Sequence, residues 1–116
     1  MSLVARRGGW DELDVLSSFR RLADDHRVAL IEDDHRVWMA HPFSGVPTEY
    51  RAVAADRSWF ANCAWDALAI LSLFGDGDAI GEGGLVWRVR QGVVAPNGLV
   101  RLVVPARKFW DDIGFT

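Results

Sequence analysis

The stretch of this 116-residue sequence with the clearest chemical potential is Asn-Cys-Ala-Trp-Asp-Ala-Leu, residues 62–68. It holds the single cysteine, Cys63, and an aspartate, Asp66, three positions later. With Asn62 as N-cap, Cys63 begins a helix and Asp66 follows one turn on, on the same face. The helix N-terminus lowers a thiol pKa, so the pair could combine a soft-metal ligand or nucleophile with a proton-transferring carboxylate. The alternative is a buried core thiol, with Asp66 paired to an arginine such as Arg88.

Local patterns around this stretch predict the elements that would position it. Helices repeat apolar residues every three or four positions, strands alternate them, and Gly and Pro mark turns. In chain order we expect a helix over about 12–25 capped by Asp11, a hairpin over 27–40 turning at 32–35, a rigid loop over 41–50, a short strand within 49–55, a helix over 62–74 closed by a left-handed Gly75, a flexible Gly-rich connector over 75–84, and a hairpin over 85–104 turning at Pro96-Asn97-Gly98. This order predicts an α+β fold, a small antiparallel sheet with two main helices.

Composition narrows the classes of function. The formal net charge is −3, so no basic field attracts nucleic acid. A single cysteine excludes an internal disulfide and a multi-cysteine zinc site, and a free thiol fits a reducing compartment. The longest apolar run, 61–74, is too short to cross a bilayer, and the N-terminus has no apolar stretch typical of a signal peptide. We therefore expect a cytoplasmic protein with no nucleic-acid or membrane partner.

Aromatic and polar residues near the cysteine could wall a pocket for a small-molecule substrate. Six tryptophans are many for this length, and most should lie in the core. His41 has no ligand partner at metal-binding spacing, so a structural role is the simpler reading, although it could line the pocket and move protons. The candidate substrate-binding residues are Trp65, His41, Phe43, Tyr50 and Trp59.

Three blocks of sequence resemble a known family. They are W-M-A-H-P-F-S-G-V-P-T at 38–48, S-W-F-A-N-C-A-W-D-A-L-A-I at 58–70 and V-P-A-R-K-F-W-D-D-I-G-F-T at 104–116. Their order and spacing are similar to those of the alkylmercury lyase (organomercurial lyase) family, which cleaves carbon–mercury bonds by protonolysis. The resemblance implies that Cys63 captures the metal as a thiolate and that Asp66 relays a proton to the departing carbon. It implies hydrocarbon and protein-bound Hg(II) as products, and no cofactor.

The sequence departs from this family at one catalytic position. In relatives, a stretch similar to D-D-I-G-F-T is followed by a second catalytic cysteine, whereas these 116 residues contain only Cys63. The family's N-terminal region resembles a winged helix. Here we expect one domain over 1–116, with a reduced helix-plus-hairpin part over 1–45 and a catalytic-type core over 46–116.

Three functions stay open from the sequence. The first is a lyase-like enzyme that uses Cys63 and Asp66. The second is a repurposed relative, in which Asp66 acts as general acid or base in an isomerase, cyclase or lyase reaction on an organic molecule. The third is a non-catalytic soft-metal binder, for which Cys63 would need ligands from a partner. A homodimer is also left open.

Overall fold

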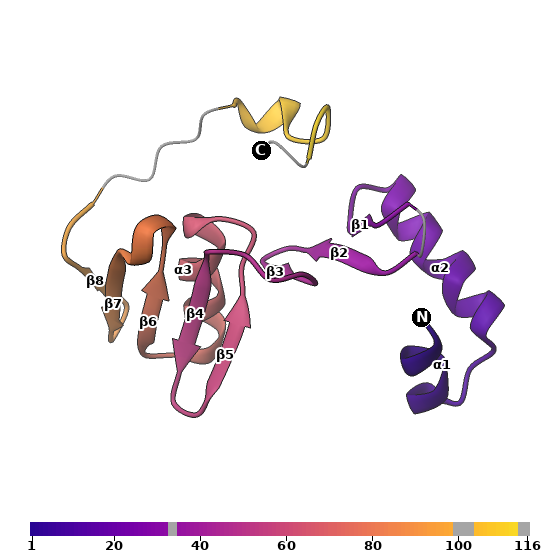
Figure 1. Cartoon of the computed structure of the whole chain (residues 1–116), viewed down its shortest axis with the longest axis horizontal. Coiled ribbons are helices and arrows are strands. Elements are labelled where there is room, and N and C mark those ends of the chain that lie inside the picture. Colours follow the sequence, from indigo (N-terminus) through magenta and orange to yellow (C-terminus); the bar gives the residue numbers. More distant parts are fainter. Residues whose placement is uncertain (33–34, 99–103, 114–116) are drawn as a thin grey trace.

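Two antiparallel sheets organise the protein, as the computed structural model in Figure 1 shows. The structure describes residues 1–32, 35–98 and 104–113. The larger sheet has the strand order β5-β4-β6-β7-β8, and the smaller has the order β1-β2-β3. The elements are α1 (Ser2–Gly8), α2 (Glu12–Asp24), β1 (Ala29–Leu30), β2 (Val37–Ala40), β3 (Phe43–Ser44), β4 (Arg51–Ala54), β5 (Arg57–Phe60), α3 (Ala64–Phe74), β6 (Gly77–Ile80), the 3₁₀ turn η1 (Glu82–Gly84), β7 (Val86–Arg90), β8 (Val93–Ala95) and the 3₁₀ turn η2 (Ala106–Lys108). The expected α+β class is confirmed.

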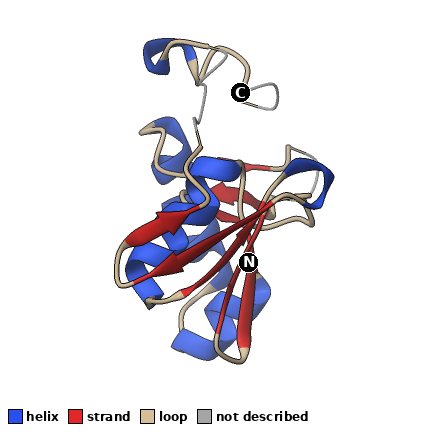
Figure 2. Cartoon of the chain, turned by 90° about the vertical axis from the view of Figure 1, so that its left-hand side faces the viewer, coloured by secondary structure: helices blue, strands red, loops and turns tan. Residues whose placement is uncertain are grey.

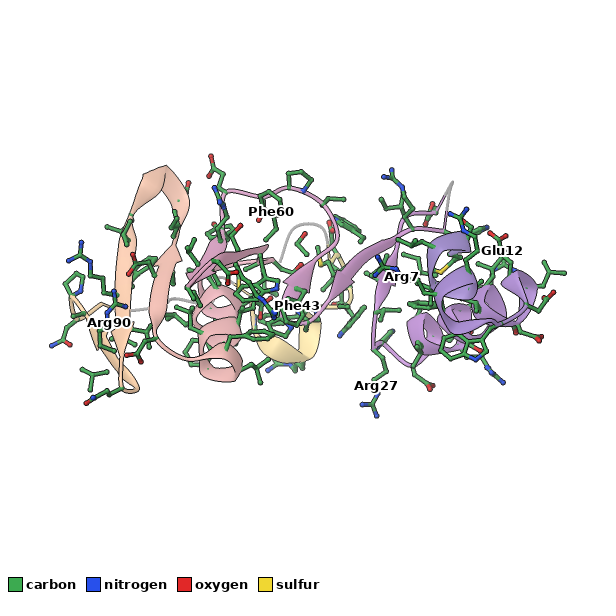
Figure 3. The ribbon with its side chains drawn as sticks, turned by 90° about the horizontal axis from the view of Figure 1, so that it is seen from below. Arg7, Glu12, Arg27, Phe43, Phe60 and Arg90 are labelled. Atoms are coloured by element: carbon green, nitrogen blue, oxygen red, sulfur yellow. The ribbon has the colours of Figure 1, made fainter. Side chains whose placement is uncertain are left out.

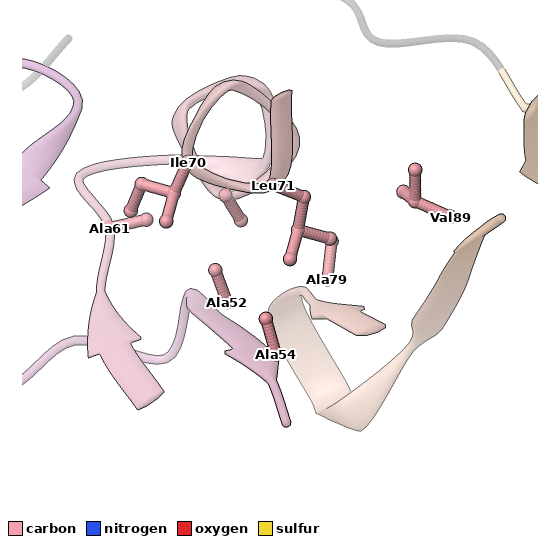
Figure 4. Close-up of a cluster of buried hydrophobic side chains, with 8 residues drawn as sticks. Ala52, Ala54, Ala61, Ile70, Leu71, Ala79 and Val89 are labelled. Atoms are coloured by element: carbon pink, nitrogen blue, oxygen red, sulfur yellow. The ribbon is translucent and has the colours of Figure 1, made fainter. Parts of the chain in front are cut away.

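The hydrophobic core lies between α3 and one face of the larger sheet (Figures 1 and 2). Figure 4 shows Ile70 and Leu71 projecting from α3 toward the strands. They are the largest fully buried side chains among the described residues. The surfaces that they meet are mostly alanine: Ala52, Ala54, Ala61, Ala67 and Ala79. Alanines in the strands let the helix approach the sheet closely, so this small core depends on two large side chains.

The N-terminal helices pack beside the smaller sheet, away from this core (Figure 1). Asp11 caps α2 as expected, because its side chain accepts hydrogen bonds from the backbone N–H groups of Leu13 and Asp14. The expected hairpin over 27–40 forms as β1 and β2, while its turn at 33–34 lies outside the described residues. A bridge between Phe43 and Ala61 joins the two sheets.

Helix α1 and strand β5 were not predicted, and one predicted loop is partly strand. Helix α1 precedes α2, and β5 pairs with β4 as a hairpin. The loop over 41–50 contains β3, which pairs with β2 through Met39–Ser44 and Ala40–Phe43. The prolines at 42 and 47 flank these two residues, so they do not prevent the pairing.

The predicted flexible connector over 75–84 is wrong, because its residues 77–80 form β6 in the middle of the larger sheet. Glycine and alanine are poor strand formers, so the local pattern indicated a loop. Their small size is what the tertiary structure needs. A Cβ atom at Gly77 would press into the backbone carbonyl oxygen of Val53 on β4, and Ala79 lies under α3 with no exposed surface.

The last hairpin turns earlier than predicted. Strands β7 and β8 are joined at Gln91 and Gly92, whose φ angles of 51° and 75° are those of a tight hairpin turn with two left-handed residues. Pro96-Asn97-Gly98 therefore follows β8 and does not turn the hairpin, and the predicted strand over 99–103 lies outside the described residues. Arg88 and Arg90 are exposed on β7, while Val89 between them is buried.

Within residues 1–32, 35–98 and 104–113, none of the helices has the length and apolar character needed to cross a membrane.

Candidate functional site

The candidate site lies where the chain leaves β5 and enters α3. Backbone bonds hold this entry in place, since the N–H of Ala61 donates to the Tyr50 carbonyl over 2.9 Å. The hydroxyl of Thr48 lies 2.9 Å from the Tyr50 carbonyl oxygen and 2.6 Å from that of Ala61. These contacts tie the loop before β4 to the segment that carries the cysteine. They give the start of α3 a fixed position relative to the sheet.

Cys63 occupies a different position in the helix from the one expected. It is the N-cap, with extended backbone angles of −153° and 178°, and the helix itself begins at Ala64. Gly75, expected to be left-handed, has φ 99° and ψ −158°, so it lies outside the left-handed helical region. The prediction failed by one residue at the N-terminus because Asn62, a common N-cap type, is used to contact other side chains.

The pKa of the Cys63 thiol is raised, which corrects the expectation of a lowered value. Burial of the half-buried sulfur is the main cause, and the negative charge of Asp66 adds to it. The backbone N–H groups of Asp66 and Trp65, at the start of α3, act in the opposite direction. The sulfur is therefore a protected thiol until a strongly thiophilic ligand displaces its proton.

The carboxylate of Asp66 is held by two side chains from outside its own helix. Asn62 donates from Nδ2 to Asp66 Oδ2 over 2.9 Å, and His41 Nδ1 lies 3.3 Å from the same oxygen. The ion pair of Asp66 is with His41, and not with Arg88 as the alternative prediction had it. The pKa of His41 is raised, mainly by its hydrogen bond to Asp66, while burial acts against the rise.

An aromatic side chain from the C-terminal segment contacts His41 in this cluster. The ring of Trp110 meets His41 edge-on, with 6.1 Å between ring centroids. The same indole stacks on His26, which follows α2, at 4.6 Å and an interplanar angle of 8°. Segment 104–113 therefore brings the N-terminal part of the chain and the start of α3 together. Sequence spacing gives no signal for this contact.

The other predicted substrate-binding residues do not form one cluster around Cys63. Tyr50 is partly buried against the core, and its pKa is raised by burial first and then by the charges of Glu82 and Cys63. Phe43, labelled near the centre of Figure 3, meets Phe74 edge-on at 6.3 Å, and Trp59 stacks on Phe74 at 4.4 Å. Trp65 is 61% exposed. Their role in substrate binding stays a prediction.

The structure thus brings His41 to Asp66, with Cys63 three residues before Asp66. It also brings in Asn62, which was expected only as a helix cap and here contacts both His41 and Asp66. In the described part of the chain, no group of three or more His, Cys, Asp or Glu side chains could hold a metal ion. The site therefore offers one soft ligand, the Cys63 sulfur, and one carboxyl group, that of Asp66, which is hydrogen-bonded by Asn62 and His41. That donor set suits the capture of a thiophilic molecule and the transfer of a proton to it.

Comparison with known proteins defines the class. The family model of MerB, alkylmercury lyase, matches residues 43–81. This region contains strands β3 to β6 and all of α3, and it begins two residues after His41. The chain is alkylmercury-lyase-like in sequence over this region and in fold.

A solved structure of this class resembles the chain over most of its length. It is the mercury-bound form of MerB2, with a TM-score of 0.57 and 26% sequence identity. The match covers 81% of this chain and 48% of the MerB2 chain, so the protein spans about half of that relative. No curated protein sequence matches the chain.

Proposed function

We propose that this protein is a lyase that cleaves carbon–mercury bonds by protonolysis, with Cys63 as the mercury-binding thiolate and Asp66 as the acid. The observation that carries the proposal is the placement of these two residues at the start of α3, inside the region similar to alkylmercury lyase. The resemblance to a mercury-bound structure supports the same substrate class.

The proposed reaction begins with exchange at mercury. An organomercurial R–Hg–X loses X⁻, Cys63 Sγ forms the new bond to mercury, and the thiol proton leaves with X⁻ as HX. The raised pKa of the thiol does not oppose this step, because a soft cation deprotonates a coordinating thiol. Half-burial of the sulfur limits its reaction with other electrophiles.

The carbon–mercury bond then breaks as carbon is protonated. Protonated Asp66 gives its proton to carbon, and the electron pair of the Hg–C bond becomes the new C–H bond. The products are the hydrocarbon R–H, the Asp66 carboxylate and Hg(II) bound to Cys63. A small-molecule thiol from solution supplies the second sulfur that two-coordinate mercury prefers and gives its proton to solvent. A second thiol then displaces Cys63 Sγ, its proton passes to that sulfur, and the metal leaves bound to two small thiolates.

Release of benzene from phenylmercury in excess small thiol, measured in the headspace, tests this proposal. We expect benzene from the wild-type protein, and release at the level of the thiol alone from Cys63→Ser and Asp66→Asn. Asp56→Asn, an exposed carboxylate in the turn between β4 and β5, is the matched control and should keep the wild-type rate. A wild-type protein that releases no benzene above the thiol-only background would refute the lyase proposal.

A second candidate is favoured by one observation, the raised pKa of a single half-buried thiol. In this case Asp66 is a general acid or base for an organic substrate, and Cys63 packs beside it without reacting. The two variants discriminate between the candidates. The lyase loses turnover in both, whereas the second enzyme tolerates Cys63→Ser and fails with Asp66→Asn.

A further inference from the structure

We propose that His41 and Asn62 are positioning residues that reload the acid at Asp66: Asn62 holds the carboxyl group, and His41 passes it a proton taken from solvent. This inference rests on the proposed function, because it assigns the proton supply of the same site. Neither residue lies on α3, and the fold brings His41 to Asp66 across 25 positions of sequence.

Three polar atoms form a closed triangle at this point. Asn62 Nδ2 is 2.9 Å from Asp66 Oδ2 and 3.3 Å from His41 Nδ1, and the last two atoms are also 3.3 Å apart. The orientation of the amide follows from the charge of the carboxylate. The reversed amide would place two oxygens 2.9 Å apart, which is repulsive while Asp66 is ionised.

The arrangement of these three atoms is compatible with a proton on either His41 or Asp66. With the proton on His41, both Nδ1–H and the Asn62 amide donate to Asp66 Oδ2. With the proton on Asp66, the Oδ2–H group donates to Nδ1, and Oδ2 still accepts from Asn62. Asn62 therefore keeps its bond while the proton crosses between His41 and Asp66. A hydrogen bond of 3.3 Å in the free site is expected to tighten when substrate excludes water.

The difference in burial between the two side chains indicates that protons pass from solvent to His41 and then to Asp66. The Asp66 side chain is 13% exposed and the His41 side chain is 42% exposed, so the histidine is the member that meets solvent. Trp110 packs edge-on against its ring. Asp66 on α3 is the charged group that acts on the pKa of His41, while its contacts Asn62 and Trp110 are neutral. Cys63 is another titratable group at the site.

The proton balance of one turnover closes with solvent as the source. The cycle starts from the His41 imidazolium and the Asp66 carboxylate, which share one proton. His41 transfers its Nδ1 proton to Asp66 Oδ2 and becomes neutral, and Asp66 gives this proton to the departing carbon and becomes a carboxylate again. Water or a buffer acid then returns a proton to Nδ1 of His41. No electrons change hands in these steps, and the site returns to its starting protonation state.

Kinetics of hydrocarbon release in buffers of increasing concentration test the relay. We expect His41→Gln to lower kcat/KM at least about tenfold near neutral pH, and added imidazole to restore the rate in proportion to its concentration. Asn62→Ala should lower the rate of hydrocarbon release, and added imidazole should not restore it, because this variant loses the hydrogen bond that holds the carboxyl group and not a proton source. His35→Gln is the matched control, since that ring contacts Arg20 and lies outside the site. A folded His41→Gln variant with the wild-type rate, or one with lowered rate that no buffer acid restores, would overturn the proposal.

An NMR titration of ¹⁵N-labelled histidines provides a readout that needs no substrate. His41 should titrate above its ordinary range in the wild type, and this shift should disappear in Asp66→Asn. Equal His41 titration in the two proteins contradicts proton sharing, whatever the activity. If the wild type releases no hydrocarbon yet the shift depends on Asp66, the lyase function fails and the proton-sharing pair stands.

Discussion

Replacement of Ile70 by alanine should be among the most damaging core substitutions, because the core contains so few large side chains. Ile70 has no exposed surface and lies on α3 four residues after Asp66, on the same face of the helix. The buried residues around it are mostly alanines, which are too small to close a gap, and the larger side chains packed against this cluster, such as Phe43 and Trp59, are only partly buried. The substitution therefore leaves a cavity directly below the turn that carries the candidate site.

The structure gives the magnitude of this loss. Burying the outer carbons of an isoleucine stabilises the fold by about 2.5 kcal/mol, at about 0.8 kcal/mol for each methylene. The unfilled cavity raises the total cost of Ile70→Ala to about 3–4 kcal/mol. Small domains have unfolding free energies of about 5–15 kcal/mol, so this single change removes a large share of the stability.

Urea denaturation followed by circular dichroism measures this change. Leu73→Ala is the matched control, because Leu73 lies on the same helix but is 63% exposed, and it should change the unfolding free energy by less than about 0.5 kcal/mol. The slope of the transition should be the same in all three proteins. Equal losses for the two variants, or a loss below about 1 kcal/mol at Ile70, would refute the argument that α3 is anchored by its two large side chains.

Two further predictions concern pH and close packing. The pKa of His41 is raised in the folded state, so its contribution to stability should be complete below the unfolded-state value near 6.5 and should be lost as pH rises through the higher folded-state value. The unfolding free energy, measured across this pH window, should show the loss in the wild type and not in Asp66→Asn. Gly77→Ala should cost about 1–3 kcal/mol in thermal or urea unfolding, since the new methyl group meets the Val53 carbonyl. Ser58→Ala, an exposed strand position, should leave stability within about 0.5 kcal/mol, and a tolerated Gly77→Ala would show that β4 and β6 can separate freely.

Long-range packing explains why some predictions failed. Gly77 and Ala79 have low strand propensity, but the space between β4, β7 and α3 accepts only small side chains there. The last hairpin turns at Gln91-Gly92 and not at Pro96-Asn97-Gly98, so that β8 pairs with β7 through Arg88–Ala95 and Arg90–Val93. Turn chemistry is present at both places, and only the sheet selects between them.

The pKa of the Cys63 thiol likewise depends on long-range packing that the local sequence does not reveal. Position at the start of α3 predicts a lowered pKa, and the N–H groups of Trp65 and Asp66 do act in that direction. Burial and the charge of Asp66 outweigh them. Burial is a property of the assembled core, so the local helix geometry could not give the sign.

The sequence by itself determined the parts of the protein that depend on neighbours along the chain. These are the cap of α2 at Asp11, the first hairpin, the apolar character of α3, and the spacing that puts Cys63 and Asp66 at its start. Only the tertiary structure decided which groups act on that pair. The contacts of Asp66 with His41, and of Trp110 with His26 and His41, join residues far apart in sequence, and such contacts exist only once the sheets and helices have packed.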